Sequence, residues 1–313
     1  MSPGGVDTRV TVGAVTLPTP VIAASGTFGY GLEFAGILDL AAIGAICVKG
    51  LSLAPYAGKP PPRLVECPAG MLNAIGLQNI GVAAFLSEKL PLLRKIKNIV
   101  FFCNVFGHTQ EDYEEAVRVL NDGDGIHGYE LNVSCPNTKC GGIAFGIDPK
   151  MLFDVVSAVK KIATRPVIVK LSPNVTSIPQ MAQVAEEAGA DALSLVNTFV
   201  GMAIDAENRR PRISNITAGL SGPAIKPIAL RMVWEAAKTV KVPIIGIGGI
   251  STAEDVIEFM LAGASAIEVG TVNFWDPCAC ETLVDSLTKW CLEHRIEKLS
   301  SLTGGLQTEP LIE

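Results

Sequence analysis

The chain has 313 residues, of which 49% are hydrophobic and 18% charged, so it is long and apolar enough to form a large folded core. The net charge of -6 excludes an extensive basic surface for nucleic acid or an anionic membrane. No apolar run reaches the ~18–20 residues that cross a bilayer. The N-terminus lacks a signal-peptide pattern, so we expect a cytoplasmic protein.

The elements expected in chain order begin with a β-hairpin over residues 9–17 (RVTVGAVTL), turning at Gly13. Eight continuously apolar runs follow, as expected of strands buried on both faces. They are PVIAAS, GAICVKG, IVFFCNVFG, GYELNVS, PVIVKLSPN, ALSLVNT, PIIGIGGI and AIEVGT, ending at residues 25, 50, 107, 134, 174, 198, 250 and 271. Helical patterns between them include residues 111–120, 150–162, 180–188, 224–239 and 253–261.

Eight strands alternating with helices over about 250 residues predict an α/β fold, a (β/α)8 TIM barrel. A doubly wound open sheet is the alternative, but the first strand ends in SGTFGYG, which lacks the G-x-G-x-x-G spacing of that fold. The hairpin is expected to close the bottom of the barrel. Segments 51–78 and 200–222 are too long for simple connections, so we expect inserted loops at the C-terminal face that cover or bind a ligand.

Polar residues end most of the apolar runs, where the active sites of such barrels lie. Burying these groups without partners is costly, so their convergence predicts a polar ligand. They are Ser25, Lys49, Asn104, Asn132, Ser134, Cys135, Lys170, Ser172, Asn174, Asn197, Thr198 and Thr271, while Gly248, Gly249 and Gly270 occupy the corresponding places of the last two strands. The glycine turns of the last two strands indicate a phosphate site, unless they serve barrel closure only. Two lysines beside amides suit an electron-rich ring such as a flavin, unless either lysine lies on the surface.

The stretch NVSCPNTKC holds Cys135 and Cys140, of which Cys135 directly follows the fourth strand. A thiol in a polar loop can act as an acid or base, although most free cysteines are simply packed, as we expect for Cys47, Cys103 and Cys291. The eight cysteines contain no C-x2-C pair and the chain has three histidines, so we expect no metal site.

Seven motifs in order, from about residue 10 to residue 292, resemble the soluble class of dihydroorotate dehydrogenases. They are ASGTFGYG, NAIGLQN, NVSCPN, VKLSPN, VNT, LSGPAIKPIALR and IGIGGI with VGT. The resemblance implies that residues 1–313 form a single barrel domain that binds FMN. It also implies oxidation of (S)-dihydroorotate to orotate in de novo pyrimidine (UMP) biosynthesis, with hydride passing to FMN and a proton to a cysteine.

The resemblance assigns roles residue by residue. FMN would be held by Ser25, Lys49, Gly50, Asn104, Asn132, Lys170, Val196, Gly222, Gly248, Gly249, Gly270 and Thr271. Dihydroorotate would contact Lys49, Asn73, Ala74, Ile75, Gly76, Leu77, Asn132, Asn197 and Thr198. Cys135 matches the catalytic base, and Lys49 would be the second catalytic residue, offsetting negative charge; the membrane-bound class has serine at the cysteine position.

The motif NAIGLQN looks like the NAD-linked branch, class 1B, in which electrons pass to a partner subunit carrying FAD and a 2Fe-2S cluster. That implies a heterotetramer around a homodimer of this chain, with no nucleic acid or membrane partner. Three alternatives stay open: a fumarate-linked class 1A enzyme, a subunit like dihydropyrimidine dehydrogenase, and a barrel that binds FMN or orotate as a sensor without catalysis.

Overall fold

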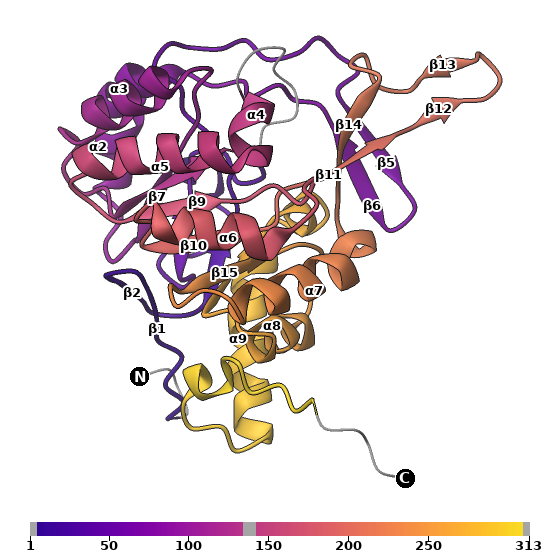
Figure 1. Ribbon diagram of the computed structural model, residues 1–313. Coiled ribbons are helices and arrows are strands. Elements are labelled where there is room, and N and C mark those ends of the chain that lie inside the picture. The colour runs from indigo at the N-terminus through magenta and orange to yellow at the C-terminus, as the bar shows by residue number, and fades with distance from the viewer. Residues whose placement is uncertain (1–4, 134–141, 309–313) are drawn as a thin grey trace.

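The computed structural model of the chain describes residues 5–133 and 142–308. Its centre is a closed barrel of eight parallel strands, with helices packed around the outside (Figure 1). The strands are β3 (Val21–Ala23), β4 (Ala45–Cys47), β7 (Phe101–Val105), β8 (Gly128–Asn132), β9 (Val167–Lys170), β10 (Ala192–Leu195), β15 (Ile244–Ile247) and β16 (Ala266–Val269). Each lies within one of the eight predicted runs, and β16 pairs with β3 to close the barrel, so the predicted (β/α)8 fold is confirmed.

The outer layer contains the five predicted helices, with ends displaced by no more than a few residues. The helices are α1 (Gly81–Ala84), α2 (Leu90–Leu93), α3 (Gln110–Leu120), α4 (Gly142–Ile147), α5 (Pro149–Ile162), α6 (Ile178–Glu187), α7 (Lys226–Ala237), α8 (Ala253–Leu261) and α9 (Ala279–Glu293). Single turns or short helices are η1 (Leu32–Phe34), the π-helical η2 (Phe85–Lys89), η3 (Pro223–Ile225), η4 (Thr271–Phe274) and η5 (Leu299–Leu302). Thr109 and Thr252 begin α3 and α8 with reciprocal capping boxes, which explains why those two starts were predictable.

The predicted N-terminal hairpin is present as β1 (Val10–Val12) and β2 (Val15–Leu17). Its turn contains Gly13 at φ 56, and a Cβ added there would stand 3.2 Å from the Cβ of Asp191 and 3.6 Å from that of Pro166. Those two residues precede β10 and β9. The hairpin therefore lies against the N-terminal ends of the barrel strands.

The two long insertions pair with each other in a four-stranded antiparallel sheet, which we call the cover sheet. Its order is β11 (Phe199–Met202), β14 (Thr217–Ser221), β6 (Gly70–Asn73) and β5 (Leu64–Cys67). A hairpin of β12 (Ile204–Asp205) and β13 (Arg210–Pro211) projects from it (Figure 1). The sequence predicted inserted loops at this face; it did not predict that they form a sheet.

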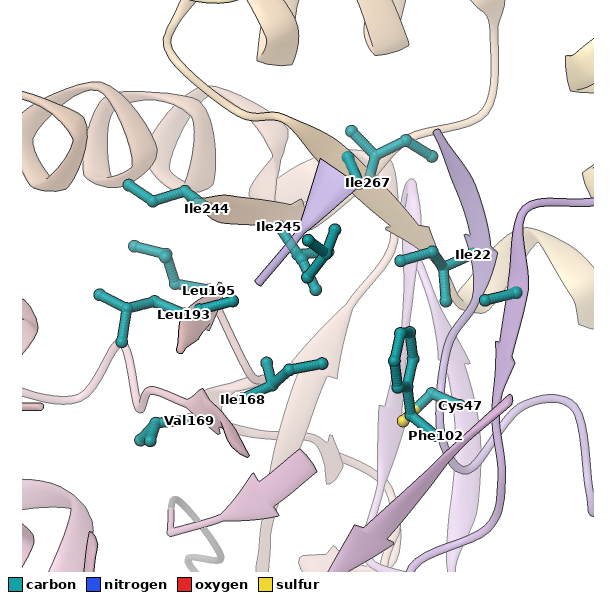
Figure 2. Packing of buried hydrophobic residues seen from close by; sticks show 14 of the residues in the cluster. Ile22, Cys47, Phe102, Ile168, Val169, Leu193, Leu195, Ile244, Ile245 and Ile267 are labelled. Carbon is teal, nitrogen blue, oxygen red and sulfur yellow. The ribbon is translucent and has the colours of Figure 1, made fainter. Parts of the chain in front are cut away.

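The barrel interior is apolar in its lower part. Figure 2 shows Ile22, Phe102, Ile168 and Ile245 from four strands gathered inside the barrel. Alternate residues of a strand face the same side. The inward positions two residues further along these strands therefore lie at the C-terminal mouth.

Candidate active site at the carboxyl end of the barrel

A cavity of about 900 Å³ lies at the C-terminal ends of the barrel strands, beneath the cover sheet. Residues that follow or end all eight barrel strands line it, together with Leu64, Met71, Asn73 and Ser221 of the cover sheet. Its volume is at the upper end of the range for cofactor and small-molecule sites, about 300–1,000 Å³. It can therefore hold a large planar cofactor and a small substrate together.

The cavity brings together residues that are far apart in the sequence. All twelve residues that the resemblance assigned to FMN line it. So do eight of the nine assigned to the substrate, the exception being Ala74. Ala74 is fully buried in a small second core with Leu72, Ile213 and Ala218, because it lies on the face of the cover segment turned away from the cavity. Cys135 and Cys140 lie outside the described residues.

Three of the carboxamides that line the cavity, those of Asn73, Asn132 and Asn197, are the ones assigned to the substrate. The Nδ2 of Asn197 donates to the Oδ1 of Asn132 at 3.3 Å, and the Nδ2 of Asn73 lies 3.4 Å from the carbonyl oxygen of Gly219. The backbone N–H of Thr198 donates to the Oδ1 of Asn197 at 2.8 Å, which fixes the orientation of that amide. Together the amides offer both donors and acceptors in one place, as recognition of a planar ring with alternating N–H and C=O groups requires.

Lys49 lies at the rim of the cavity and is half-buried. Its backbone N–H donates to the carbonyl oxygen of Gly29 at 2.8 Å, and a Cβ added to Gly26 would stand 3.7 Å from its Nζ. The Oγ of Ser25 donates to the carbonyl oxygen of Val48 at 2.8 Å. These bonds hold the loop after β3 against the end of β4, so the ammonium is placed beside the cavity.

The glycine turns after β15 bring backbone close to the cavity. Gly248 and Gly249 have φ of 135 and 74, a region that residues with a Cβ rarely adopt. A Cβ at Gly249 would stand 2.8 Å from the carbonyl oxygen of Gly222. These turns therefore require glycine and leave backbone exposed to a ligand, which fits a phosphate group.

Lys170 emerges from β9 and forms ion pairs that the sequence did not reveal. Its Nζ lies 2.9 Å from the Oε2 of Glu268 and 3.4 Å from the Oε1 of Glu130. Burial alone would lower the pKa of this lysine, but the two carboxyl groups raise it above its usual value. Lys170 is therefore a cation although only 5% of it is exposed.

The acidic partners come from inside two apolar strands, GYELN and AIEV. Burial would raise the pKa of Glu130, but Lys170 and several hydrogen bonds outweigh it and lower the pKa to about 2. Burial and then the charge of Glu130 raise the pKa of Glu268 well above its usual value. An acid in the middle of an apolar strand was the signal in the sequence that could have revealed both.

Asn104 links this buried group to the cavity. Its Nδ2 donates to the Oε1 of Glu130 at 2.6 Å, whereas its Oδ1 is buried without a hydrogen-bond partner in the described part of the chain. A buried acceptor without a partner is costly, and this residue lines the cavity. An N–H group of a bound ligand would satisfy it, as the edge of a flavin ring can.

The family model for dihydroorotate dehydrogenase matches residues 8–290. The chain belongs to the dihydroorotate dehydrogenase family. The family expected from the seven motifs is therefore confirmed. No helix among residues 5–133 and 142–308 of this family member is long and apolar enough to span a membrane.

Relatives within the dihydroorotate dehydrogenase family carry two kinds of name. A protein of Citrifermentans bemidjiense is 55% identical over 96% of this chain and 98% of its own length; its name is dihydroorotate dehydrogenase B (NAD(+)), catalytic subunit. A Geotalea uraniireducens protein of the same name is also 55% identical, over 97% of this chain and 100% of its own length. A Solibacter usitatus protein, provisionally named dihydroorotate dehydrogenase A (fumarate), is 58% identical over 95% of this chain and 97% of its length.

A solved structure has the same fold. It is the dihydroorotate dehydrogenase of Eimeria tenella in complex with ferulenol, which aligns with a TM-score of 0.81 over 96% of this chain and 88% of its own. The sequences are 23% identical, so this similarity supports the barrel alone.

Proposed function

We propose that this chain is the catalytic subunit of an NAD-linked dihydroorotate dehydrogenase, with one FMN bound in the single domain formed by residues 1–313. It oxidises (S)-dihydroorotate to orotate in pyrimidine biosynthesis. The observation that carries the proposal is the cavity: in a barrel of this family, it collects every proposed FMN residue and three convergent carboxamides.

The residues fit the cofactor. FMN has a phosphate, for which the backbone turns at Gly248, Gly249, Gly270 and Thr271 are suited, and a ring edge, for which Asn104 and Lys170 are suited. When bound, FMN supplies the hydride acceptor. The cation of Lys170 favours negative charge at the ring edge, and its buried carboxyl partners keep it in place.

The residues proposed to bind or deprotonate the substrate have separate roles. Asn73, Asn132 and Asn197 bind the planar pyrimidine ring through amide hydrogen bonds, and Lys49 offsets the charge of the substrate carboxylate. Cys135, by the family resemblance, removes the proton from the ring carbon next to the carbonyl. General-base help of this kind contributes about 10²–10⁴-fold in rate.

The electrons must then leave the flavin. The names of relatives 52–55% identical to this chain support an NAD-linked route through a partner subunit, for which we propose FAD and a 2Fe-2S cluster. The chain itself has no cysteine run for such a cluster. We propose two copies of this chain at the centre of a heterotetramer. The Solibacter relative makes fumarate reduction the second candidate.

Anaerobic addition of dihydroorotate to the FMN-loaded chain tests the reaction, because reduction of the flavin should bleach its absorbance as soon as the two are mixed. Dihydrouracil, a two-electron donor without the carboxylate of dihydroorotate, should leave the flavin oxidised. The chain alone should reduce NAD slowly, and the rate of NAD reduction should rise when a partner subunit is added. Full-rate NAD reduction by the chain alone would contradict the partner, and brisk turnover with fumarate would identify the class 1A route. Unchanged absorbance with dihydroorotate would favour a sensor.

A further inference from the structure

Beneath the cavity lies a layer of polar side chains that we call the floor cluster. It consists of Cys47, Asn104, Glu130, Lys170 and Ser194 from the five consecutive strands β4, β7, β8, β9 and β10, together with Glu268 from β16 across the barrel. None of the six is more than 5% exposed. Asn104 and Lys170 line the cavity, whereas the other four do not. The cluster therefore connects two proposed FMN ligands to four groups that do not line the cavity.

Glu130 is the centre of the floor cluster because four donors converge on it. Its Oε1 accepts from the Nδ2 of Asn104 at 2.6 Å, from the Sγ of Cys47 at 3.1 Å and from the Nζ of Lys170 at 3.4 Å. Its Oε2 accepts from the Oγ of Ser194 at 2.7 Å. A carboxylate surrounded only by donors holds them all in orientation, and two of them are the side chains presented to the cavity.

Glu268 approaches the same group from the opposite side. Its Oε2 accepts from the Nζ of Lys170 at 2.9 Å, and one of its carboxyl oxygens lies within 4.8 Å of a carboxyl oxygen of Glu130. Two ionised carboxylates this close together and this deeply buried (0% and 2% exposed) repel each other strongly, which favours a proton on one of them. With that proton the charges of Lys170 and Glu130 cancel, and the cluster is neutral. Without it, a net negative charge would be buried, at a large cost.

We propose that Glu130 and Glu268 form a one-proton pair, Glu130 as carboxylate and Glu268 as acid, that positions the Lys170 ammonium and the Asn104 amide for the cofactor. Glu130 and Glu268 are positioning residues, because they act through the two side chains at the cavity. The identity of the cofactor in this inference rests on the proposed function. The proton shared by the two carboxyl groups rests on their geometry alone.

The titratable groups facing Glu268 agree with this arrangement. They are Glu130 from β8, Lys170 from β9 and the thiol of Cys47 from β4, and the pKa of that thiol is itself raised by burial. The ligand atoms of Cys47, Glu130 and Glu268 lie within 4.8 Å of one another, a spacing that could suit a metal ion. Lys170 already bonds to both carboxyl groups, so the positive charge of the cluster is supplied by the chain.

Infrared spectroscopy of the FMN-free protein tests the proton directly. The wild type at pH 8 should show the carbonyl band of a protonated carboxylic acid, and Glu268→Gln should lack it. Glu130→Gln should lack it too, because Glu268 is then the only carboxyl group beside Lys170 in the described part of the chain and ionises. Glu258→Gln, at a carboxyl that pairs with Lys226 on the surface, is the matched control and should keep the band.

FMN binding to the same proteins tests the positioning. Glu268→Gln keeps the charge and shape of the pair, so its Kd for FMN should stay within about threefold of wild type. Glu130→Gln removes the charged acceptor that orients Asn104, and should weaken binding by about tenfold or more. Circular dichroism checks that each variant folds. Where a variant does not fold, an infrared titration of the carboxylic-acid band in the wild type tests the proton pair instead.

Absence of the band in the wild type at pH 8 would overturn the proposal, as would its persistence in Glu130→Gln. Equal loss of FMN affinity in both glutamine variants would overturn the positioning roles. A wild type that shows the band but binds no FMN would contradict the proposed function and leave the proton pair standing.

Discussion

Replacing Lys170 by methionine should strongly destabilise the protein at alkaline pH. The side chain is 7% exposed, and its Nζ lies 2.9 Å from Glu268 and 3.4 Å from Glu130. At an effective dielectric constant of about 20, the contact with the ionised Glu130 represents about 5 kcal/mol of gross attraction, whereas Glu268, as the neutral acid, contributes a hydrogen bond. Removing one partner of such a buried pair costs a net of about 3–5 kcal/mol, because the Glu130 charge is left uncompensated.

The cost should depend on pH with a defined sign. Without Lys170, the folded-state pKa of Glu130 rises above its unfolded value of about 4.3. A raised carboxyl pKa stabilises the folded state at low pH, and this contribution is lost as the pH rises through the folded pKa. The destabilisation should therefore be about 3–5 kcal/mol at pH 8 and fall to about 1–2 kcal/mol at pH 5.

Urea unfolding of the FMN-free protein, followed by circular dichroism at both pH values, measures this difference. Lys150→Met is the matched control, because that lysine is 82% exposed and pairs with Asp154 on the surface, where about 0–1 kcal/mol is expected. The double variant Lys170→Met with Glu130→Gln should recover most of the loss. A cost below about 1 kcal/mol at pH 8, or one that does not change with pH, would refute the reasoning.

Three further predictions concern a glycine turn, a helix cap and the proposed catalytic base. Gly249→Ala should cost about 2–4 kcal/mol of unfolding free energy, because its backbone has φ 74 and its Cβ would stand 2.8 Å from a carbonyl oxygen. The control is Gly270→Ala, whose Cβ would meet nothing closer than 3.7 Å and which should cost under about 1 kcal/mol. Equal shifts of the melting temperature in the two variants would contradict this. Asp255→Asn should cost about 1 kcal/mol near pH 7. Although burial opposes it, hydrogen bonds lower the pKa of Asp255, so its contribution exists above about pH 4 and disappears as the pH falls; an unfolding difference that persists at pH 2.5 would disagree. Cys135→Ala should bind FMN and orotate yet lose about 10²–10⁴-fold in turnover, whereas Cys140→Ala should stay active; full activity of the first would remove it from the mechanism.

The barrel was predictable because its strands are buried on both faces and so appear as uninterrupted apolar runs. The cover sheet was not, since its strands are short and only partly buried: Leu64–Cys67 and Phe199–Met202 alternate between exposed and half-buried residues. Their pairing depends on two insertions meeting in space, for which a single sequence carries no periodic signal.

The site was predictable where a polar residue ends a strand, because the barrel mouth is fixed by the fold. Lys170 and Asn104 were found in this way. Glu130 and Glu268 were missed because they lie within strands, where the apolar neighbours suggested packing alone. Ala74 was misplaced for a related reason: a contiguous stretch was assigned to the ligand although alternate residues of an extended segment face opposite sides.

The closure of the barrel has a consequence for how the chain folds. Val21 pairs with Ile267, and Asn73 pairs with Gly219, so both the barrel and its cover are completed by contacts between distant parts of the sequence. The entropy cost of closing such long loops comes before the free energy gained from the contacts, so it slows folding. During synthesis the first strands must remain unpaired on one edge until β16 has been made. The newly made chain therefore passes through a stage with open, apolar strand edges, at which chaperone binding is most needed.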